Sequence, residues 1–148
     1  MRHLMRLSVI AAVLAMPAAW AQNASPAGLW KTIDDETGKP KALVRVTDEQ
    51  GVLTGKIEKL FRPAEQDQNP KCTACDGQRK DQPLIGMTIL SGLKKDGNEY
   101  AGGEILDPAK GKTYKSKAAL KDGGAKLEVR GYIGAPMFGR SQTWVREQ

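Results

Sequence analysis

The chain has 148 residues, with 23 Lys and Arg against 17 Asp and Glu, and it is 40% hydrophobic but only 5% aromatic. This length suits one domain, and a charged fraction of 27% is ordinary for a soluble protein. The single histidine, His3, lies in a segment with the pattern of a cleaved signal, so histidine-dependent hydrolysis and histidine-ligated metals have no residue to use in the remaining chain. We expect no metal and no other cofactor.

Residues 1–21 have the pattern of a secretory signal peptide, with a basic start, an apolar stretch over residues 7–16 and a cleavage site after Ala19-Trp20-Ala21. The apolar stretch is about half of the ~20 residues that a spanning helix needs, so we expect export with no integral membrane segment after cleavage. Loss of two arginines lowers the formal net charge from +6 to +4. Acidic and basic side chains are interspersed in the rest, which disfavours nucleic acid as a partner.

After a short tail over residues 22–26, one domain is expected over residues 27–148. Its β-prone runs alternate with turn signals at the spacing of a sandwich or barrel. The eight predicted strands span residues 29–33, 42–47, 52–61, 85–93, 99–106, 112–120, 126–132 and 140–146.

Turns of four or five residues containing Gly separate most of these runs, as in hairpins. Each strand therefore lies antiparallel beside its predecessor, and closing the meander removes two exposed edges. The predicted fold is an all-β, eight-stranded antiparallel up-and-down barrel. Glycines within the runs, such as Gly102 and Gly103, indicate bends or bulges.

A long loop over residues 62–84 contains Cys72 and Cys75. Zinc would need two further ligands, covalent haem would need His where Asp76 stands, and a thioredoxin-type pair would need a helix start. A local disulfide that fixes the loop is therefore expected, with a redox-active bridge as the alternative. Long ordered loops on barrels are commonly binding surfaces, although a loop without any partner fits equally well.

Trp30 begins the first strand and Trp144 lies in the last, and these strands are neighbours in a closed barrel. We predict that Trp30 seals one end of the barrel beneath an arginine of the last strand, either Arg140 or Arg146.

Alternation places Glu104 on one face with Tyr100 and Leu106. On an internal face Glu104 would need a basic partner, and on an external face it would form a cross-strand ion pair. Tyr100, Glu104, Tyr132 and Arg140 are the candidate ligand-binding residues. An enzyme that uses Glu104, Tyr132 and Arg140 is a further alternative, but no pair of nucleophile and base can be named, so no catalytic residue is assigned.

The Gly28-Leu29-Trp30 start resembles the lipocalin signature. A fuller set resembles the exported bacterial family catalogued as domain of unknown function 2147. It comprises Gly55-Lys56-Ile57, Cys72-Thr73-Ala74-Cys75, Gly103-Glu104-Ile105-Leu106-Asp107-Pro108, Gly111-Lys112-Thr113-Tyr114, Arg130-Gly131-Tyr132 and Gly139-Arg140-Ser141-Gln142-Thr143-Trp144. The resemblance implies a lipocalin-like barrel in the periplasm and no established activity.

The sequence therefore predicts a periplasmic, lipocalin-like binding module for a small, mostly apolar ligand. The alternative is a protein-interaction or cell-envelope-associated module that has a solid core and works through its disulfide-pinned loop. An internal space of several hundred Å³ would favour the carrier, and a filled interior would favour the alternative.

Overall fold

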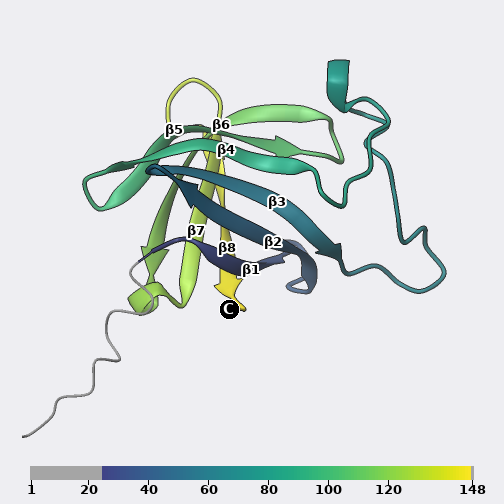
Figure 1. Cartoon of the computed structure of the whole chain (residues 1–148), viewed down its shortest axis with the longest axis horizontal. Helices are drawn as coiled ribbons and strands as arrows, with labels where there is room; N and C mark the ends of the chain where they lie inside the picture. The colour runs from purple at the N-terminus through teal and green to yellow at the C-terminus, as the bar shows by residue number, and fades with distance from the viewer. Residues whose placement is uncertain (1–24, 148) are drawn as a thin grey trace, which may run out of the picture.

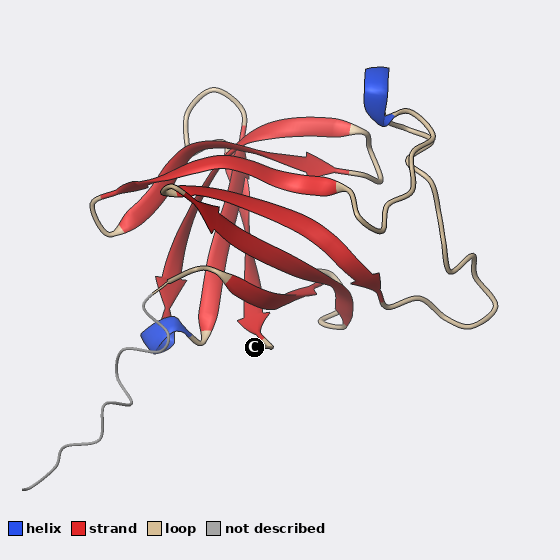
Figure 2. Ribbon diagram, in the orientation of Figure 1, coloured by secondary structure: helices blue, strands red, loops and turns tan. Residues whose placement is uncertain are grey.

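The computed structural model describes residues 25–147, so the predicted signal peptide over residues 1–21 lies outside the described residues. Eight antiparallel strands form a closed barrel in simple chain order (Figures 1 and 2). They are β1 (Gly28–Ile33), β2 (Pro40–Glu49), β3 (Val52–Leu60), β4 (Thr88–Asp96), β5 (Glu99–Asp107), β6 (Lys112–Lys121), β7 (Lys126–Tyr132) and β8 (Gly139–Arg146). Two single-turn 3₁₀ helices, η1 (Gly77–Arg79) and η2 (Asp122–Gly124), lie in connections. The predicted up-and-down barrel is confirmed.

The fourth strand begins later than the sequence pattern predicts. The β-prone run starts at residue 85, but β4 starts at Thr88. The chain turns before that point, because the amide of Met87 donates to the carbonyl of Leu84 (3.0 Å) and the amide of Gly86 donates to the carbonyl of Ile57 (2.7 Å). The connection between β3 and β4 therefore spans residues 61–87 and is called the long loop below.

Alternating side chains fill the barrel interior. On β2, Val44 and Val46 are buried while Arg45 between them is half-buried, as alternation predicts. The interior cluster joins buried residues from every strand except β5, whose half-buried Tyr100 and Ile105 pack against it: Trp30, Ala42, Val44, Val46, Leu53, Ile57, Leu90, Leu93, Ala118, Leu127, Val129 and Trp144. Among the described residues, Ser116 has a buried hydroxyl without a hydrogen-bond partner.

One end of the barrel is sealed by Trp30 and Arg146, which face each other across the β1–β8 pair. The guanidinium of Arg146 lies 4.3 Å from the centre of the Trp30 ring, and the indole N–H of Trp30 donates to the carbonyl of Pro26 (2.8 Å). Arg146 also donates to the carbonyls of Gly124 (2.8 Å) and Ala27 (3.0 Å), and burial lowers its pKa. Of the two arginines that the sequence offered for this role, Arg146 fills it; we call this the sealed end.

The opposite, open end carries the long loop, the β1–β2 turn and the β7–β8 loop. Figure 1 shows the long loop projecting beyond the barrel where β3 ends and β4 begins. Within residues 25–147, no helix is long and apolar enough to cross a membrane.

Candidate functional site

The long loop is pinned by the disulfide between Cys72 and Cys75. Both cysteines are 1% exposed and pack against Met87 and Leu106, so the bridge lies between the loop and the outside of β5. The predicted disulfide is present, and its burial disfavours the redox-active alternative, because a readily reducible bridge would be exposed. The bridge thus attaches this part of the long loop to the outside of the barrel.

Backbone contacts hold the pinned loop in place. The amide of Cys72 donates to the carbonyl of Gln82 (2.8 Å), and the amide of Asp81 donates to the carbonyl of Cys72 (2.9 Å). Across from the loop, Gly111 has φ 63°, and a Cβ atom at this position would collide with the carbonyl of Ala74. The β5–β6 turn and the disulfide segment therefore meet backbone to backbone, which only Gly permits here.

Two hollows of about 340 and 350 Å³ flank η1, and Arg79 lines both. The guanidinium of Arg79 donates to the hydroxyl of Thr113 on β6 (3.4 Å), which holds it between the hollows. The first hollow, called the loop hollow below, is lined by Gln78, Arg79, Gln82, Pro83, Ile85, Gly86, Met87 and Thr88. The second is lined by Cys75, Asp76, Arg79, Leu106, Gly111, Lys112 and Thr113.

The loop hollow combines apolar surface with a positive charge. Ile85 is 40% exposed beside the buried Met87, so apolar side chains are available to a bound molecule. Arg79 adds a charged donor that favours a carboxylate or another hydrogen-bond acceptor. Sequence reasoning did not single out Arg79 or Ile85 as site residues, because neither belongs to a motif and only the fold brings them together.

The four predicted ligand-binding residues do not converge. Glu104 is exposed and lies opposite Lys115, which in turn lies opposite Tyr132, so this row is on the outer face of the barrel. Tyr100 lies opposite the buried Ala118 and packs against the interior cluster. Burial, and then the negative charge of Asp48, raise the pKa of Tyr100.

A bulge explains why Tyr100 and Glu104 are separated, contrary to the alternation read from the sequence. The pairing of β5 with β6 shifts register between Tyr100 and Gly103, where Gly102 has φ 75°. One extra residue reverses the side-chain alternation, so Tyr100 faces inward and Glu104 outward. Their predicted common face is wrong.

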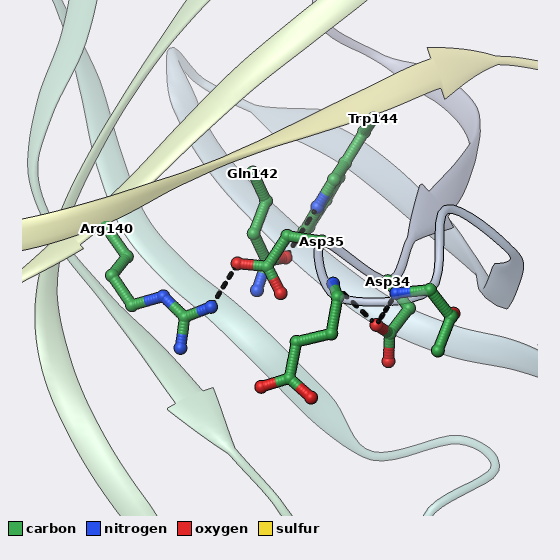
Figure 3. A network of polar contacts seen from close by, with 7 residues as sticks. Asp34, Asp35, Arg140, Gln142 and Trp144 are labelled. Carbon is green, nitrogen blue, oxygen red and sulfur yellow. Dashed lines mark hydrogen bonds and ion pairs between the residues drawn. The ribbon is translucent and has the colours of Figure 1, made fainter.

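Arg140 lies at the open end, away from Trp30. It pairs with Asp35 of the β1–β2 turn, and Figure 3 shows this contact beside Gln142 and Trp144. The indole of Trp144 donates to the side-chain oxygen of Gln142 (3.1 Å). Arg140 therefore lies apart from the Trp30 seal, which corrects the role predicted for Arg140, whereas Trp144 lies opposite Thr32 of β1 and packs with Trp30 in the interior cluster.

The turn that supplies Asp35 is itself ordered by its neighbour, Asp34. The carboxylate of Asp34 accepts hydrogen bonds from the amides of Glu36 and Thr37, both at 2.9 Å. These two bonds hold the pKa of Asp34 below its usual value. The turn is therefore preformed where it meets Arg140.

Comparison with known proteins decides the family. A family model described as an uncharacterized protein conserved in bacteria (DUF2147) matches residues 28–146. The chain belongs to this family. No curated protein matches this DUF2147 chain.

One solved structure similar to this DUF2147 protein is described as protein HP1028 from the human pathogen Helicobacter pylori, which belongs to the lipocalin family. The two share 20% identity over 84% of each chain, with a TM-score of 0.69. This likeness shows a lipocalin-like fold. In the described part of this DUF2147 chain, no group of three or more Cys, His, Asp or Glu side chains is placed to hold a metal ion.

Proposed function

We propose that this DUF2147 protein is a periplasmic binding module for a small, mostly apolar ligand that carries one acidic or hydrogen-bond-accepting group. The observation that carries the proposal is the loop hollow, where Arg79 stands beside exposed Ile85 and buried Met87. Its volume of about 340 Å³ lies in the range of small-molecule sites. The apolar part of the ligand contacts Ile85, and its acceptor group contacts Arg79.

The barrel interior is a less suitable place for the ligand. The two largest buried side chains, Trp30 and Trp144, lie in the interior cluster together with the leucines and valines of the other strands. Neither hollow is lined by a member of that cluster. A filled interior favours the alternative over a ligand carried inside the barrel, so our proposal places the small ligand in the loop hollow, on the outside of the barrel.

A first experiment asks whether a natural ligand exists. Native mass spectrometry of the protein purified from its own periplasm should show a stoichiometric small-molecule adduct. Bare protein accompanied by a co-purifying macromolecule would instead support the alternative of a protein-interaction module.

A second experiment locates the site with anilinonaphthalene sulfonate, an apolar anion. The substitution Arg79→Gln removes the charged donor and should weaken binding about tenfold, as expected for one charge-assisted contact. Arg62→Gln is the matched control, because Arg62 lies in the same loop, is exposed, and donates to the carbonyl of Asp67 outside the hollow (2.7 Å). Equal affinity of the two variants for the dye, measured by fluorescence titration, would rule out the loop hollow as its site.

A further inference from the structure

The last strand has an edge without a partner. Strand β8 pairs with β7 over its whole length, from Gly139 to Val145, but it pairs with β1 only at Trp144, Val145 and Arg146. The β1–β2 ladder ends at the pairing of Ile33 with Pro40; the turn beyond it contacts the first half of β8 through the ion pair of Asp35 with Arg140, but it forms no backbone pairs there in the described structure. Residues 139–143 are all exposed. We call residues 139–143 the open edge.

The direction of the backbone groups along the open edge follows from two hydrogen bonds. The amide of Arg146 donates to Ala125 on the β7 side, and the amide of Glu147 donates to Leu29 on the β1 side. Because N–H groups alternate along a strand and the β7–β8 register is unbroken, the amides and carbonyls of Gly139, Ser141 and Thr143 point away from β7. Within residues 25–147, no backbone group pairs with them.

Apolar side chains stand at the tip of the same hairpin. Ile133, Met137 and Phe138 are 56%, 76% and 68% exposed, and they lie within the short β7–β8 loop. Arg130 holds this loop rigidly, since its guanidinium donates to the carbonyls of Pro136 (2.6 Å) and Gly139 (3.3 Å). A preformed apolar tip beside a free strand edge is typical of a protein-docking surface.

We propose that the open edge pairs with the open edge of a second copy of this chain, extending the sheet across a twofold axis. Antiparallel pairing centred on Ser141 places Ser141 opposite Ser141, Gly139 opposite Thr143 and Arg140 opposite Gln142 of the second copy. The outward amides at 139, 141 and 143 then donate to the outward carbonyls of the second copy, and the carbonyl of Gly139 accepts this bond in addition to the one from Arg130 (3.3 Å).

Charge and shape favour this self-pairing. No like charges face each other across the axis, because Arg140 lies opposite a neutral amide and already pairs with Asp35 of its own chain (Figure 3). In this pairing, the β7–β8 loop of one copy extends beyond residue 143 of the second copy and lies near the end of the second copy's β1. Met137 and Phe138 are thereby covered, which removes exposed apolar surface from water.

The test is the oligomeric state of the full mature protein, measured by sedimentation equilibrium over a range of concentrations. The wild-type protein should show a monomer–dimer equilibrium. Ser141→Pro removes an N–H that points outward, so it leaves the β7–β8 ladder intact and should weaken dimerisation by at least about tenfold. Ser141→Ala is the matched control, because it loses the same hydroxyl contact with Arg130 (3.0 Å) but keeps the amide, and it should dimerise as the wild type does.

The substitution Phe138→Ser tests the apolar tip and should also weaken the dimer. A wild-type protein that stays monomeric up to ~1 mM would overturn the proposal. So would an unchanged dimer in Ser141→Pro, or a monomer that sediments with phosphatidylglycerol vesicles through Phe138, since a membrane would then cover the tip. The dye-binding site at Arg79 lies on another loop, so Ser141→Pro should still bind the dye, which keeps this test independent of the proposed function.

Discussion

Arg146 shows how one side chain serves several parts of the fold. Its guanidinium lies over the Trp30 ring. Its three nitrogens donate hydrogen bonds to three carbonyls: that of Gly124 in η2, that of Ala27 just before β1, and that of Ser25. The bonds to Ala27 and Ser25 join residues separated by more than 100 positions, so they connect the last strand to the start of the described chain. The sequence could suggest an arginine near Trp30 because β1 and β8 are neighbours in a closed barrel. It could not choose between Arg140 and Arg146, since that choice depends on the register of β8 against β1.

The substitution Arg146→Met keeps a long side chain but removes the charge and the donors. We expect the free energy of unfolding to fall by roughly 2 kcal/mol, because the carbonyls of Gly124 and Ala27 lose their partner together with the cation–π contact. Urea titration followed by tryptophan fluorescence measures the change. The control is Arg45→Met, which breaks an exposed pair with Glu58 and should cost less than about 1 kcal/mol. Equal losses in the two variants would contradict a special role for Arg146.

At the scale of elements, the strands follow from local signals. Alternation and glycine turns place seven strands within two residues of their observed ends, because both signals are set by neighbouring residues. The start of β4 was missed because the turn at residues 84–87 depends on Ile57 of a different strand. The bulge at Gly102 and the loop hollow around Arg79 were missed for the same reason: long-range packing determines both.

The disulfide fixes part of the long loop against the outside of β5. The double substitution Cys72→Ser with Cys75→Ser removes a disulfide between cysteines only 3 positions apart. Because so short a loop restricts the unfolded chain little, the free energy of unfolding should fall by no more than about 2 kcal/mol. Because the buried sulfurs fix the loop against β5, limited trypsin digestion should cut faster at Lys71, Arg79 or Lys80, while the circular dichroism of the barrel stays unchanged.

The matched variant for the loop is Gly111→Ala, which keeps the disulfide but pushes the loop away from the β5–β6 turn. It should show the same faster digestion. If neither variant changes the digestion, then the loop is held by its backbone hydrogen bonds alone.

At the scale of the whole molecule, the barrel depends on a short closure. Strands β1 and β8 share three pairs, the fewest of any neighbouring strands in the described chain, and these pairs close the sheet into a barrel. Because β1 pairs only with residues 144–146 of β8, the open edge over residues 139–143 has no partner strand. The short β1–β8 pairing therefore both closes the barrel and leaves the proposed docking surface. The sequence predicted that these strands meet, but not how far they run together, because the bend at Ile33 is set by its bulged pairing with β2.

The closure can be tested at Lys31, which lies opposite Val145. The amide of Glu147 donates to the carbonyl of Leu29, so these two residues form a hydrogen-bonded pair. Hydrogen-bonded pairs recur at every second residue of an antiparallel ladder, so Lys31 and Val145 form the next one. Lys31→Pro removes that donor and should cost about 3 kcal/mol or more, with light scattering from exposed strand edges. Lys31→Ala loses only the exposed ion pair with Glu147 (3.2 Å), which costs less than about 1 kcal/mol. If urea unfolding shows equal stability for the two variants, the barrel does not depend on the β1–β8 pair, and the register that defines the open edge loses its support.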